Sequence, residues 1–329
     1  MEKRVRTSPH LSGIRPKLGT VLLAMLLAFP FPLHAQDYPN RPVRIVVPTG
    51  LSGLPDLVIR TVVPAMSKQL SQSVIVENRP SVGGIVGMEY VAKQVPPDGY
   101  TLLAGWSGLP RAPLTASLRF DVLKDLPAIS VLAGGPTALV TAASAPFNTF
   151  PELLAYAKAN PGKLNFGATA DAVQWDAVTQ KFGLNVVTIM YKSTPQLQQA
   201  VLTGEVQLSY AAVQRSIGDA RAKKIKYLAV TSEKRLVEFP ETPTFTDIGL
   251  PAIRGFWVSL HAPLGTPRMR MAAIHAAVDY ALQQPEVKDF MAKNWMDIIG
   301  SSPAVADKYV TDEHDFYAAL AKALNISPQ

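Results

Sequence analysis

Residues 43–76 read VRIVVPTGLSGLPDLVIRTVVPAMSKQLSQSVIV, and this stretch decides the fold. It opens with a β-branched run, 43–47, that ends at Pro48 and is typical of a buried strand. Apolar residues at helical spacing follow over 56–70, with Asp56 expected as the N-cap and Pro64 expected to kink or split the helix. The second β-branched run, 74–76, predicts another strand. Strand, helix and strand in this order predict a right-handed βαβ unit.

The same alternation continues along the chain. Further strands are expected at 100–104, 164–166, 186–190, 206–210 and 226–231. Helices are expected at 84–93, from a capping box at Thr149 to Pro161, and at 174–182, 195–202, 268–282, 285–293 and 303–324. Two α/β halves with a helical tail follow from this order. Ligands of such sheets bind beyond the carboxyl ends of the strands, which between two domains means a cleft.

The first 35 residues differ from the rest. Five basic residues precede an apolar run, 18–33, and small Ala35 follows at a cleavage position. This order is that of a cleavable signal peptide, and the run, broken by Pro30 and Pro32, is too short for a membrane span. The whole chain carries 32 Lys and Arg against 25 Asp and Glu, a net charge of +7. Without the five bases and one acid of the leader the net charge is +3, so little basicity remains to favour a nucleic-acid partner.

The sequence gives little support for catalysis or metal binding. The chain has no cysteine, which excludes disulfides, zinc–thiolate sites and thiol nucleophiles. Outside the leader, His261, His275 and His314 are far apart, so we expect no metal site and no cofactor. Residues 105–109, GWSGL, nearly match the G-x-S-x-G elbow of serine hydrolases but lack the last glycine. An esterase built on Ser107 therefore stays a minor alternative.

Polar and glycine-rich loops follow the expected strands at 49–56, 81–87, 105–108, 167–173 and 192–195. Several of them lead directly into helices, whose free N–H groups and partial positive charge attract carboxylates. Part of these residues would be explained by tight turns alone. Their recurrence at one end of both halves favours a binding cleft.

Several motifs resemble those of one family. They are YPNRP (38–42), VENRP (76–80) followed by Gly83 and Gly84, PDGYTLL (97–103), YAKANPGKLNFG (156–167) and LAVTS (228–232). In this order they resemble the extracytoplasmic substrate-binding receptors of tripartite tricarboxylate transporters, the Bug-type or TctC receptors. Each motif alone is weak, but together they span the chain after the leader.

The resemblance implies a two-domain α/β periplasmic-binding-protein (Venus-flytrap) fold. Each domain would be a mostly parallel sheet flanked by helices, with the ligand in the interdomain cleft. Domain I would be residues 36–136 plus 254–329 and domain II residues 137–253, with crossings near 134–136 and 253–255. The family further implies a monomeric receptor, not an enzyme, that captures a small organic acid or related metabolite in the periplasm. The receptor would pass it to a membrane permease, or report it to a signalling sensor.

Positions in the expected cleft can be assigned by the same resemblance. The predicted ligand-binding residues are Thr49, Ser52, Gly53, Asp56, Gly84, Trp106, Ser107, Ala168, Thr169, Asp171, Trp175, Lys192, Ser193 and Ala211.

Two cleft loops depart from the family pattern. In the loop 167–173 two family glycines are alanines and Asp171 is a new carboxylate, while Asp176 stands where the family has a histidine. An Asp–Asn pair of the family is replaced by Ala211 and Ala212. With Trp106 and Trp175 near the cleft, these changes favour a larger ligand with an aromatic or amphipathic body, whose polar end is one carboxylate, an amide or a cationic group. The alternative is that backbone N–H groups alone preserve carboxylate binding. Both hypotheses stay open.

Overall fold

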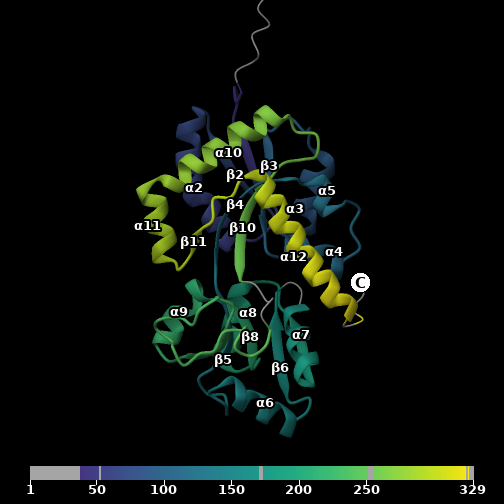
Figure 1. Cartoon of the computed structure of the whole chain (residues 1–329), viewed down its shortest axis with the longest axis vertical. Coiled ribbons are helices and arrows are strands. Elements are labelled where there is room, and N and C mark those ends of the chain that lie inside the picture. The colour runs from purple at the N-terminus through teal and green to yellow at the C-terminus, as the bar shows by residue number, and fades with distance from the viewer. Residues whose placement is uncertain (1–37, 52, 170–172, 251–254, 324, 326–329) are drawn as a thin grey trace, which may run out of the picture. The chain divides into compact units, whose positions relative to one another are not determined.

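Two β-sheets organise the computed structural model, which describes residues 38–51, 53–169, 173–250, 255–323 and 325. The first sheet has the order β11-β4-β10-β3-β1-β2 and the second β7-β6-β8-β5-β9. The first comprises β1 (Val43–Val47), β2 (Val74–Asn78), β3 (Thr101–Trp106), β4 (Ala128–Gly135), β10 (Phe256–His261) and β11 (Asp297–Ile298). The second comprises β5 (Thr137–Ala142), β6 (Leu164–Ala168), β7 (Val186–Met190), β8 (Leu208–Ala212) and β9 (Ile225–Val230). Both sheets are flanked by helices, as predicted (Figure 1).

Both sheets are mixed rather than mostly parallel. In the first, β1 pairs in parallel with β2 and β3, but β10 runs antiparallel to both β3 and β4. In the second, β6 pairs in parallel with β7 and β8, and β5 runs antiparallel to β8 and β9. The antiparallel ladders belong to strands β4, β5 and β10, for which the sequence predicted no strand. These strands connect the sheets, since β4 ends at Gly135 and β5 begins at Thr137.

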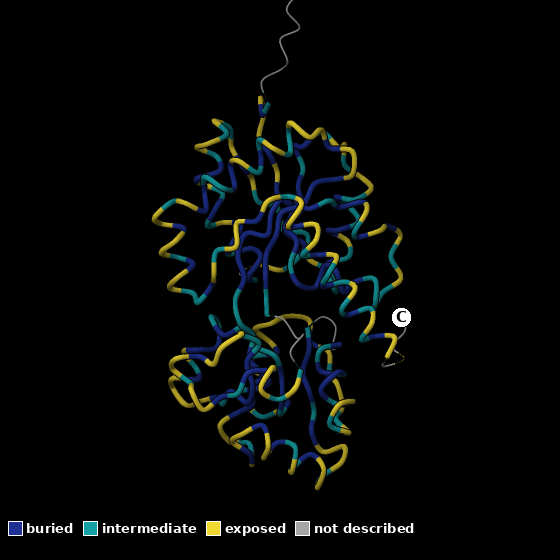
Figure 2. The backbone as a smooth tube through the Cα atoms, in the orientation of Figure 1, coloured by how far each residue is buried: buried dark blue, intermediate teal, exposed yellow. Residues whose placement is uncertain are grey.

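Helices cover both faces of the first sheet. One face packs against α2 (Leu54–Leu70), α10 (Arg268–Gln283) and α11 (Pro285–Lys293) in a core that contains Ile45 and Leu102. The other face, with Val46 and Leu103, packs against α3 (Ile85–Glu89), η2 (Tyr90–Gln94), α4 (Ala112–Thr115), α5 (Val122–Asp125) and α12 (Pro303–Ala323). Short turns η1 (Val82–Gly84) and η3 (Leu109–Arg111) complete this side. Because successive strand residues point to opposite faces, one strand contributes side chains to both cores. Buried strands and half-exposed helices are visible in Figure 2.

Helix α2 corrects two sequence predictions. Gly53 rather than Asp56 is its N-cap, and Asp56 lies in the first helical turn, where a carboxylate suits the positive end of the helix. Pro64 lies inside one continuous helix and does not split it. Pro64 is exposed, so the carbonyl that its missing N–H leaves without a partner can be hydrated on the outer side.

The second sheet carries two helices on each face. Helices α6 (Phe150–Ala159) and α7 (Val173–Phe182) pack on one face, and α8 (Thr194–Thr203) and α9 (Val213–Arg221) pack on the other. The predicted cap of α6 is confirmed, since the Thr149 side chain accepts a hydrogen bond from the N–H of Glu152. These helices all follow strands of the second sheet directly.

Helix α12 joins the two halves. Its residues pack on β4 of the first sheet and also contact α7 of the second. Gln174 Nε2 donates to the Tyr317 hydroxyl at 2.6 Å, and Gln180 Nε2 donates to the carbonyl of Ala323 at 3.2 Å. The C-terminal helix therefore ties a helix of the second sheet to the first.

Some predictions fall outside the described residues. They are the signal peptide at 1–35, Ser52, Asp171 and the residues 253 and 254 of the second crossing. The division into domains I and II stays a prediction. Among the helices that the structure describes, none combines the length and the apolar character that crossing a bilayer requires.

Candidate functional site

One large cavity lies where the strands of both sheets end. Its volume is about 640 Å³, within the range of about 300–1,000 Å³ that is usual for small-molecule sites. Residues from the loops after β1, β2, β3, β6, β7 and β8 line it. The carboxyl ends of these strands therefore converge on one space, as the loop pattern in the sequence predicted.

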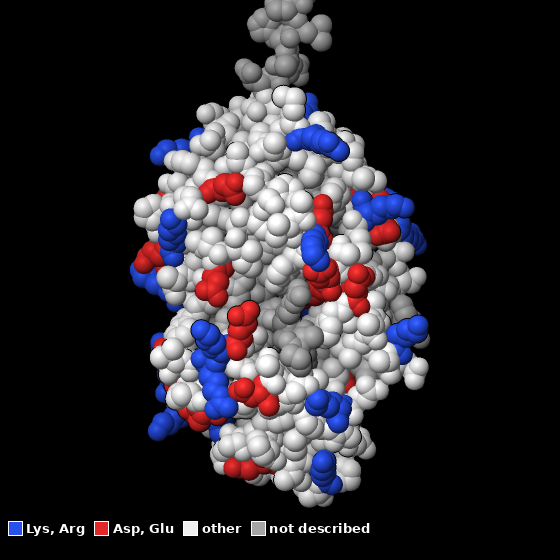
Figure 3. Space-filling view, viewed as in Figure 1, with Lys and Arg blue, Asp and Glu red and all other residues white. Residues whose placement is uncertain are grey.

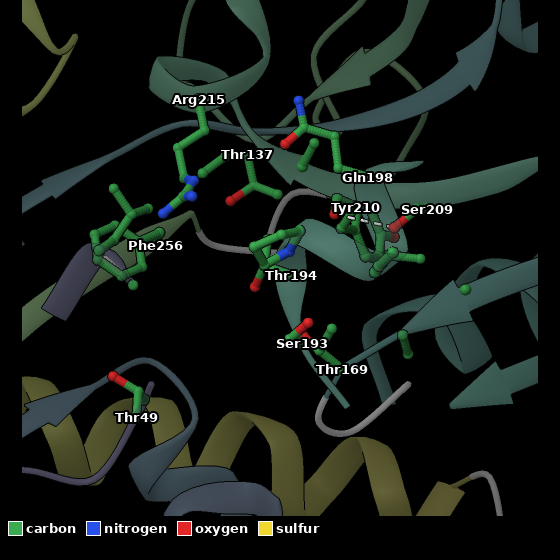
Figure 4. A pocket seen from close by; sticks show the side chains of 18 of the residues that line it. Thr49, Thr137, Thr169, Ser193, Thr194, Gln198, Ser209, Tyr210, Arg215 and Phe256 are labelled. Atoms are coloured by element: carbon green, nitrogen blue, oxygen red, sulfur yellow. Dashed lines mark hydrogen bonds between the residues drawn. The ribbon is translucent and has the colours of Figure 1, made fainter. Parts of the chain in front are cut away.

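Ten of the fourteen predicted ligand-binding residues line this cavity. They are Thr49, Gly53, Gly84, Trp106, Ser107, Ala168, Thr169, Lys192, Ser193 and Ala211. Figure 4 shows Thr49 on its loop apart from Thr169, Ser193 and Thr194, which approach from the second sheet.

Asp56 does not line the cavity but supports its wall. Its carboxylate is 3% exposed and accepts hydrogen bonds from Arg60 Nε at 3.0 Å and Asn78 Nδ2 at 2.8 Å. The same Asn78 amide lies 3.4 Å from the carbonyl of Thr49. Asp56 thus fixes the position of the Asn78 amide, which in turn contacts the loop after β1. Asn78 belongs to the VENRP motif, so this motif has a structural role in supporting the cavity wall.

Trp175 faces away from the cavity. Its side chain is fully buried in the core beneath α7 and stacks on Phe166 with ring centroids 4.6 Å apart and planes within 3°. The expected place of Trp175 near the cleft is therefore not the one observed. Asp176, the next residue, is also absent from the described lining. The reason is helical phase, because adjacent residues of α7 point about 100° apart and Gln174 takes the position toward the cavity.

Trp106 forms a flat wall of the cavity on the side of the first sheet. A Cβ at Gly84 would lie 2.4 Å from the indole Cη2, and one at Gly108 would lie 2.5 Å from Nε1. Gly84 also has φ +70, a left-handed conformation that favours glycine. These two glycines therefore let the backbone approach the indole closely. A side chain at either position would displace the ring.

The ionisable side chains of the described lining are mostly cationic. They are Arg111, Lys192 and Arg215 against the single acid Asp219. Arg111 is largely buried and donates from Nε to the carbonyl of Ser107 at 2.8 Å. Burial lowers the pKa of Arg215 from its ordinary value, yet a guanidinium stays charged at neutral pH. The lining is therefore positive, whereas cations and acids are interspersed on the face in Figure 3.

Helix N-termini add to this positive character. The start of α2, at Gly53 and Leu54, and the start of α8, at Ser193 and Thr194, both belong to the lining. The Ser193 side chain caps α8 by accepting from the N–H of Gln196 at 3.4 Å. The remaining N–H groups of a first turn and its partial charge favour an anion. Together with the cations, they suit a carboxylate.

The sequence reasoning missed a second group of lining residues. They are Thr137, Gln174, Gln198, Ser209, Tyr210, Arg215 and Phe256. Figure 4 shows Arg215 beside Phe256, with Tyr210, Ser209 and Gln198 on the other side of Thr137. Burial raises the pKa of Tyr210 well above the ordinary range, so its hydroxyl stays protonated. Arg215 was recognisable as the cation one turn after Ala211 and Ala212, but the others lie within strands or deeper in helices.

Metal binding and histidine catalysis gain no support. Among the residues that the structure describes, no group of three His, Asp or Glu side chains is placed to hold a metal ion. His261 is buried, with Nε2 2.7 Å from Ser259 Oγ and Nδ1 2.8 Å from the carbonyl of Leu126. Its burial lowers the pKa to about 4, so the ring is neutral at physiological pH. It serves as a packed core residue.

Comparison with known proteins decides the family. The sequence pattern of the family described as "Tripartite tricarboxylate transporter family receptor" matches residues 58–326. The chain belongs to this family of receptors. The resemblance seen in the motifs is thereby confirmed, and the protein is a solute-binding receptor.

Relatives of this receptor share its length and fold. A UPF0065 protein of Bordetella pertussis is 30% identical over 326 residues, which cover 95% of this chain and 98% of the relative. The solved structure of R. palustris Rpa4515 with adipate has a TM-score of 0.80 and 26% identity, covering 89% of this chain and 100% of its own. MatC (Rpa3494) from Rhodopseudomonas palustris with bound malate has a TM-score of 0.78 and 25% identity, covering 86% and 99%. The predicted periplasmic-binding-protein fold is confirmed by these likenesses.

Proposed function

We propose that this receptor captures a small organic acid in the cavity at the strand ends and delivers it to a membrane permease. The observation that carries the proposal is a cavity of about 640 Å³ whose described lining contains three cations, two helix N-termini and a single acid. A carboxylate placed there gains charge-assisted hydrogen bonds while its body is enclosed. The ligand contacts that we propose come from the ten lining residues predicted from the sequence, together with Arg215.

The relatives support an organic acid as the ligand. Two of the similar solved structures are those of Rpa4515 with adipate and of MatC with bound malate, and both ligands are small dicarboxylates. The family description names a transporter, which supports a permease as the partner. The predicted leader at 1–35 supports export to the periplasm. We propose that the receptor works there as a monomer.

Catalysis is not part of the proposal. Ser107, the candidate nucleophile, lies in the cavity wall, and His261 of the neighbouring β10 bonds Ser259 and a backbone carbonyl instead. A triad needs a histidine in hydrogen-bond reach of the serine. We expect no hydrolysis of an activated ester such as p-nitrophenyl acetate above the rate with the Ser107→Ala variant. Turnover that disappears in the variant would establish the esterase instead.

A thermal-shift screen of the chain without residues 1–35 tests the receptor function. The set includes mono-, di- and tricarboxylates, with sugars and polyamines as compounds that the positive lining should not bind. A ligand at 100 times its Kd adds about 2.7 kcal/mol of stability. For a chain of this size we expect a rise of a few degrees in Tm. The proposal fails if sugars or polyamines raise Tm and no carboxylate does.

A further inference from the structure

The two sides of the cavity carry different side chains. The lining residues that belong to the first sheet or follow its strands form the first wall, whose apolar members include Leu51, Leu54, Pro80, Val82, Trp106 and Phe256. In the part of this wall that the structure describes, Arg111 is the one ionisable side chain, and its Nε donates to the carbonyl of Ser107. Its Cζ lies 5.1 Å from the centroid of the Tyr317 ring. The first wall therefore offers a ligand mainly apolar surface.

The second wall, formed by lining residues of the second sheet and its helices, is polar. Lys192 and Arg215 belong to it, together with several hydroxyl side chains. Asp219, the acid of this wall, accepts a hydrogen bond from Gln198 Nε2 at 2.8 Å and lies 3.7 Å from Lys224 Nζ. The ammonium group offsets the charge of that acid. A carboxylate of the ligand is therefore stabilised best on the second wall.

The helices that start on the two walls differ in the same sense. Helix α2 starts on the first wall with Asp56 in its first turn, whereas the described first turn of α8, on the second wall, contains no acid. A negative side chain at the start of a helix offsets the partial positive charge that attracts an anion. The start of α8 is therefore the better place for a carboxylate.

Trp106 provides a large flat surface of the first wall, and the backbone fixes its position. A Cβ at Gly108 would lie 2.5 Å from Nε1, 2.8 Å from Cε2 and 3.1 Å from Cζ2, which places Gly108 over the ring. A Cβ at Gly84 would lie 2.4 Å from Cη2, at the far end of the indole. The indole is partly buried against the core of the first sheet, and it lines the cavity. A ring held in this way loses little conformational freedom when a ligand binds.

Trp106 and the cation Arg215 lie within the span of one small molecule. Val258 of β10 is the strand partner of Trp106, and Phe256 precedes Val258 by two residues. Diagonal neighbours of this kind lie about 7–8 Å apart in an antiparallel pair. Figure 4 shows Arg215 beside Phe256. A short ligand can therefore place a charged group at the second wall and its body on the first.

We infer that Trp106 selects ligands with an aromatic ring, which stacks on the indole while the carboxylate of the ligand lies on the second wall. This inference rests on the proposed organic-acid function and names its substrate class as aromatic carboxylic acids. Aromatic pairs are more favourable than their buried area alone accounts for. An acid without a ring makes the same contacts with the second wall but leaves the indole without a stacked partner. Trp106 is thus a specificity-determining residue.

Three acids of equal charge test the selectivity by isothermal titration calorimetry. They are acetate, cyclohexylacetate and phenylacetate, which differ in the presence and the aromaticity of a ring. We expect phenylacetate to bind at least tenfold more tightly than acetate and severalfold more tightly than cyclohexylacetate. Acetate or cyclohexylacetate that binds as tightly as phenylacetate would overturn the inference.

Two substitutions at Trp106 separate the ring from its volume. Trp106→Leu should weaken phenylacetate at least tenfold and acetate less than threefold, because the contacts of the carboxylate lie on the second wall. Trp106→Phe keeps an aromatic ring and should weaken phenylacetate less than threefold. Unchanged phenylacetate affinity in Trp106→Leu, or equal losses in the two variants, would overturn the inference.

A matched pair of glycine variants covers the case in which Trp106→Leu does not fold. Gly108 has φ −78 and ψ −22, which alanine adopts readily, so Gly108→Ala acts mainly by displacing the indole. It should weaken phenylacetate at least fivefold. Gly218→Ala adds the same methyl group on the exposed side of α9, where nothing lies within 4 Å, and should leave the affinity unchanged. Equal phenylacetate affinity in the two variants would overturn the inference.

Failure of the inference differs from failure of the proposed function. If other carboxylates bind and phenylacetate does not, the inference is wrong and the receptor function stands. If no carboxylate binds the wild-type chain, the proposed function has failed and the inference fails with it.

Discussion

The two faces of the second sheet are made by the same strands and differ in how they are filled. On the side of α6 and α7, Phe166 stacks on Trp175 and meets Tyr210 edge to face at 5.4 Å. On the side of α8 and α9, the neighbouring positions are Gly167, Ser209 and Ala211, and aliphatic side chains such as Leu197 and Val201 pack close to the strands in a second buried core. One face is filled by aromatic rings from the sheet itself, and the other by side chains of the helices. Residues one step apart in a strand therefore pack in different ways.

The largest expected effect is a loss of stability caused by a substitution in the aromatic core beneath α7. Trp175→Ala removes a fully buried indole that stacks on Phe166, and large-to-small changes of this kind cost about 3–5 kcal/mol. Urea unfolding monitored by circular dichroism measures the loss. Trp175→Phe is the control, since it keeps a stacked ring and loses a buried N–H that has no hydrogen-bond partner in the described structure. Equal losses in both variants would contradict the stacking argument.

Removal of a charge should affect ligand binding in the cavity without affecting the core. Arg215→Gln should weaken carboxylate binding about tenfold, or roughly 1.4 kcal/mol, because a charged hydrogen bond to the ligand is lost. Calorimetric titration with the carboxylate that raises Tm most in the thermal-shift screen measures it. The control is Arg221→Gln on the same helix, whose guanidinium pairs with Glu238 on the surface. If Arg221→Gln weakens binding as much, the pocket cation has no specific role.

The close packing of α8 on the second sheet can be tested at Gly167. A Cβ there would lie 2.2 Å from Leu197 Cδ1, so Gly167→Ala would force Leu197 to turn. Leu197 Cδ1 is the end of a flexible side chain, so we expect a loss of only about 1 kcal/mol in stability. Urea unfolding measures this loss. A loss of several kcal/mol would show that Leu197 cannot turn away within the packed core.

The smallest effect is a gain. Gly218 lies exposed within α9, and nothing surrounds the position of an added Cβ within 4 Å. Gly218→Ala should stabilise the helix by roughly 0.5–1 kcal/mol through lower entropy of the unfolded chain, with ligand affinity unchanged. Urea unfolding and titration measure the two quantities. Altered affinity would show that the outer side of α9 also influences the cavity.

Local patterns carried much of the fold. The first βαβ unit, the helix that begins after Thr149 and the two helices 268–283 and 285–293 were recognisable because their apolar spacing and caps are local signals. Strands β4 and β5 were missed because their sequence, AISVLAGGPTALVTA (128–142), is rich in alanine and glycine and shows no clear alternation. β10 was missed as well. These strands pair with strands that are distant in the sequence, and a local pattern cannot show such pairing.

The candidate site was predictable where loops mark it. Trp106 ends a strand and Thr49, Gly84 and Ser193 follow strand ends, and parallel strands bring their ends to one edge. Asp56 and Trp175 lie close to those loops in sequence but point elsewhere, because helical phase separates neighbours by about 100°.

The sequence by itself determined that this chain alternates strands and helices, that glycine-rich loops follow the strands, and that its motifs are those of a receptor family. Such features depend on neighbouring residues, whose spacing and propensity act locally. Only the tertiary structure decided that Thr49, Trp106 and Arg215, from three separate parts of the chain, line one cavity. A cavity depends on which side chains of separate strands and helices meet, and no local pattern encodes the space that they leave.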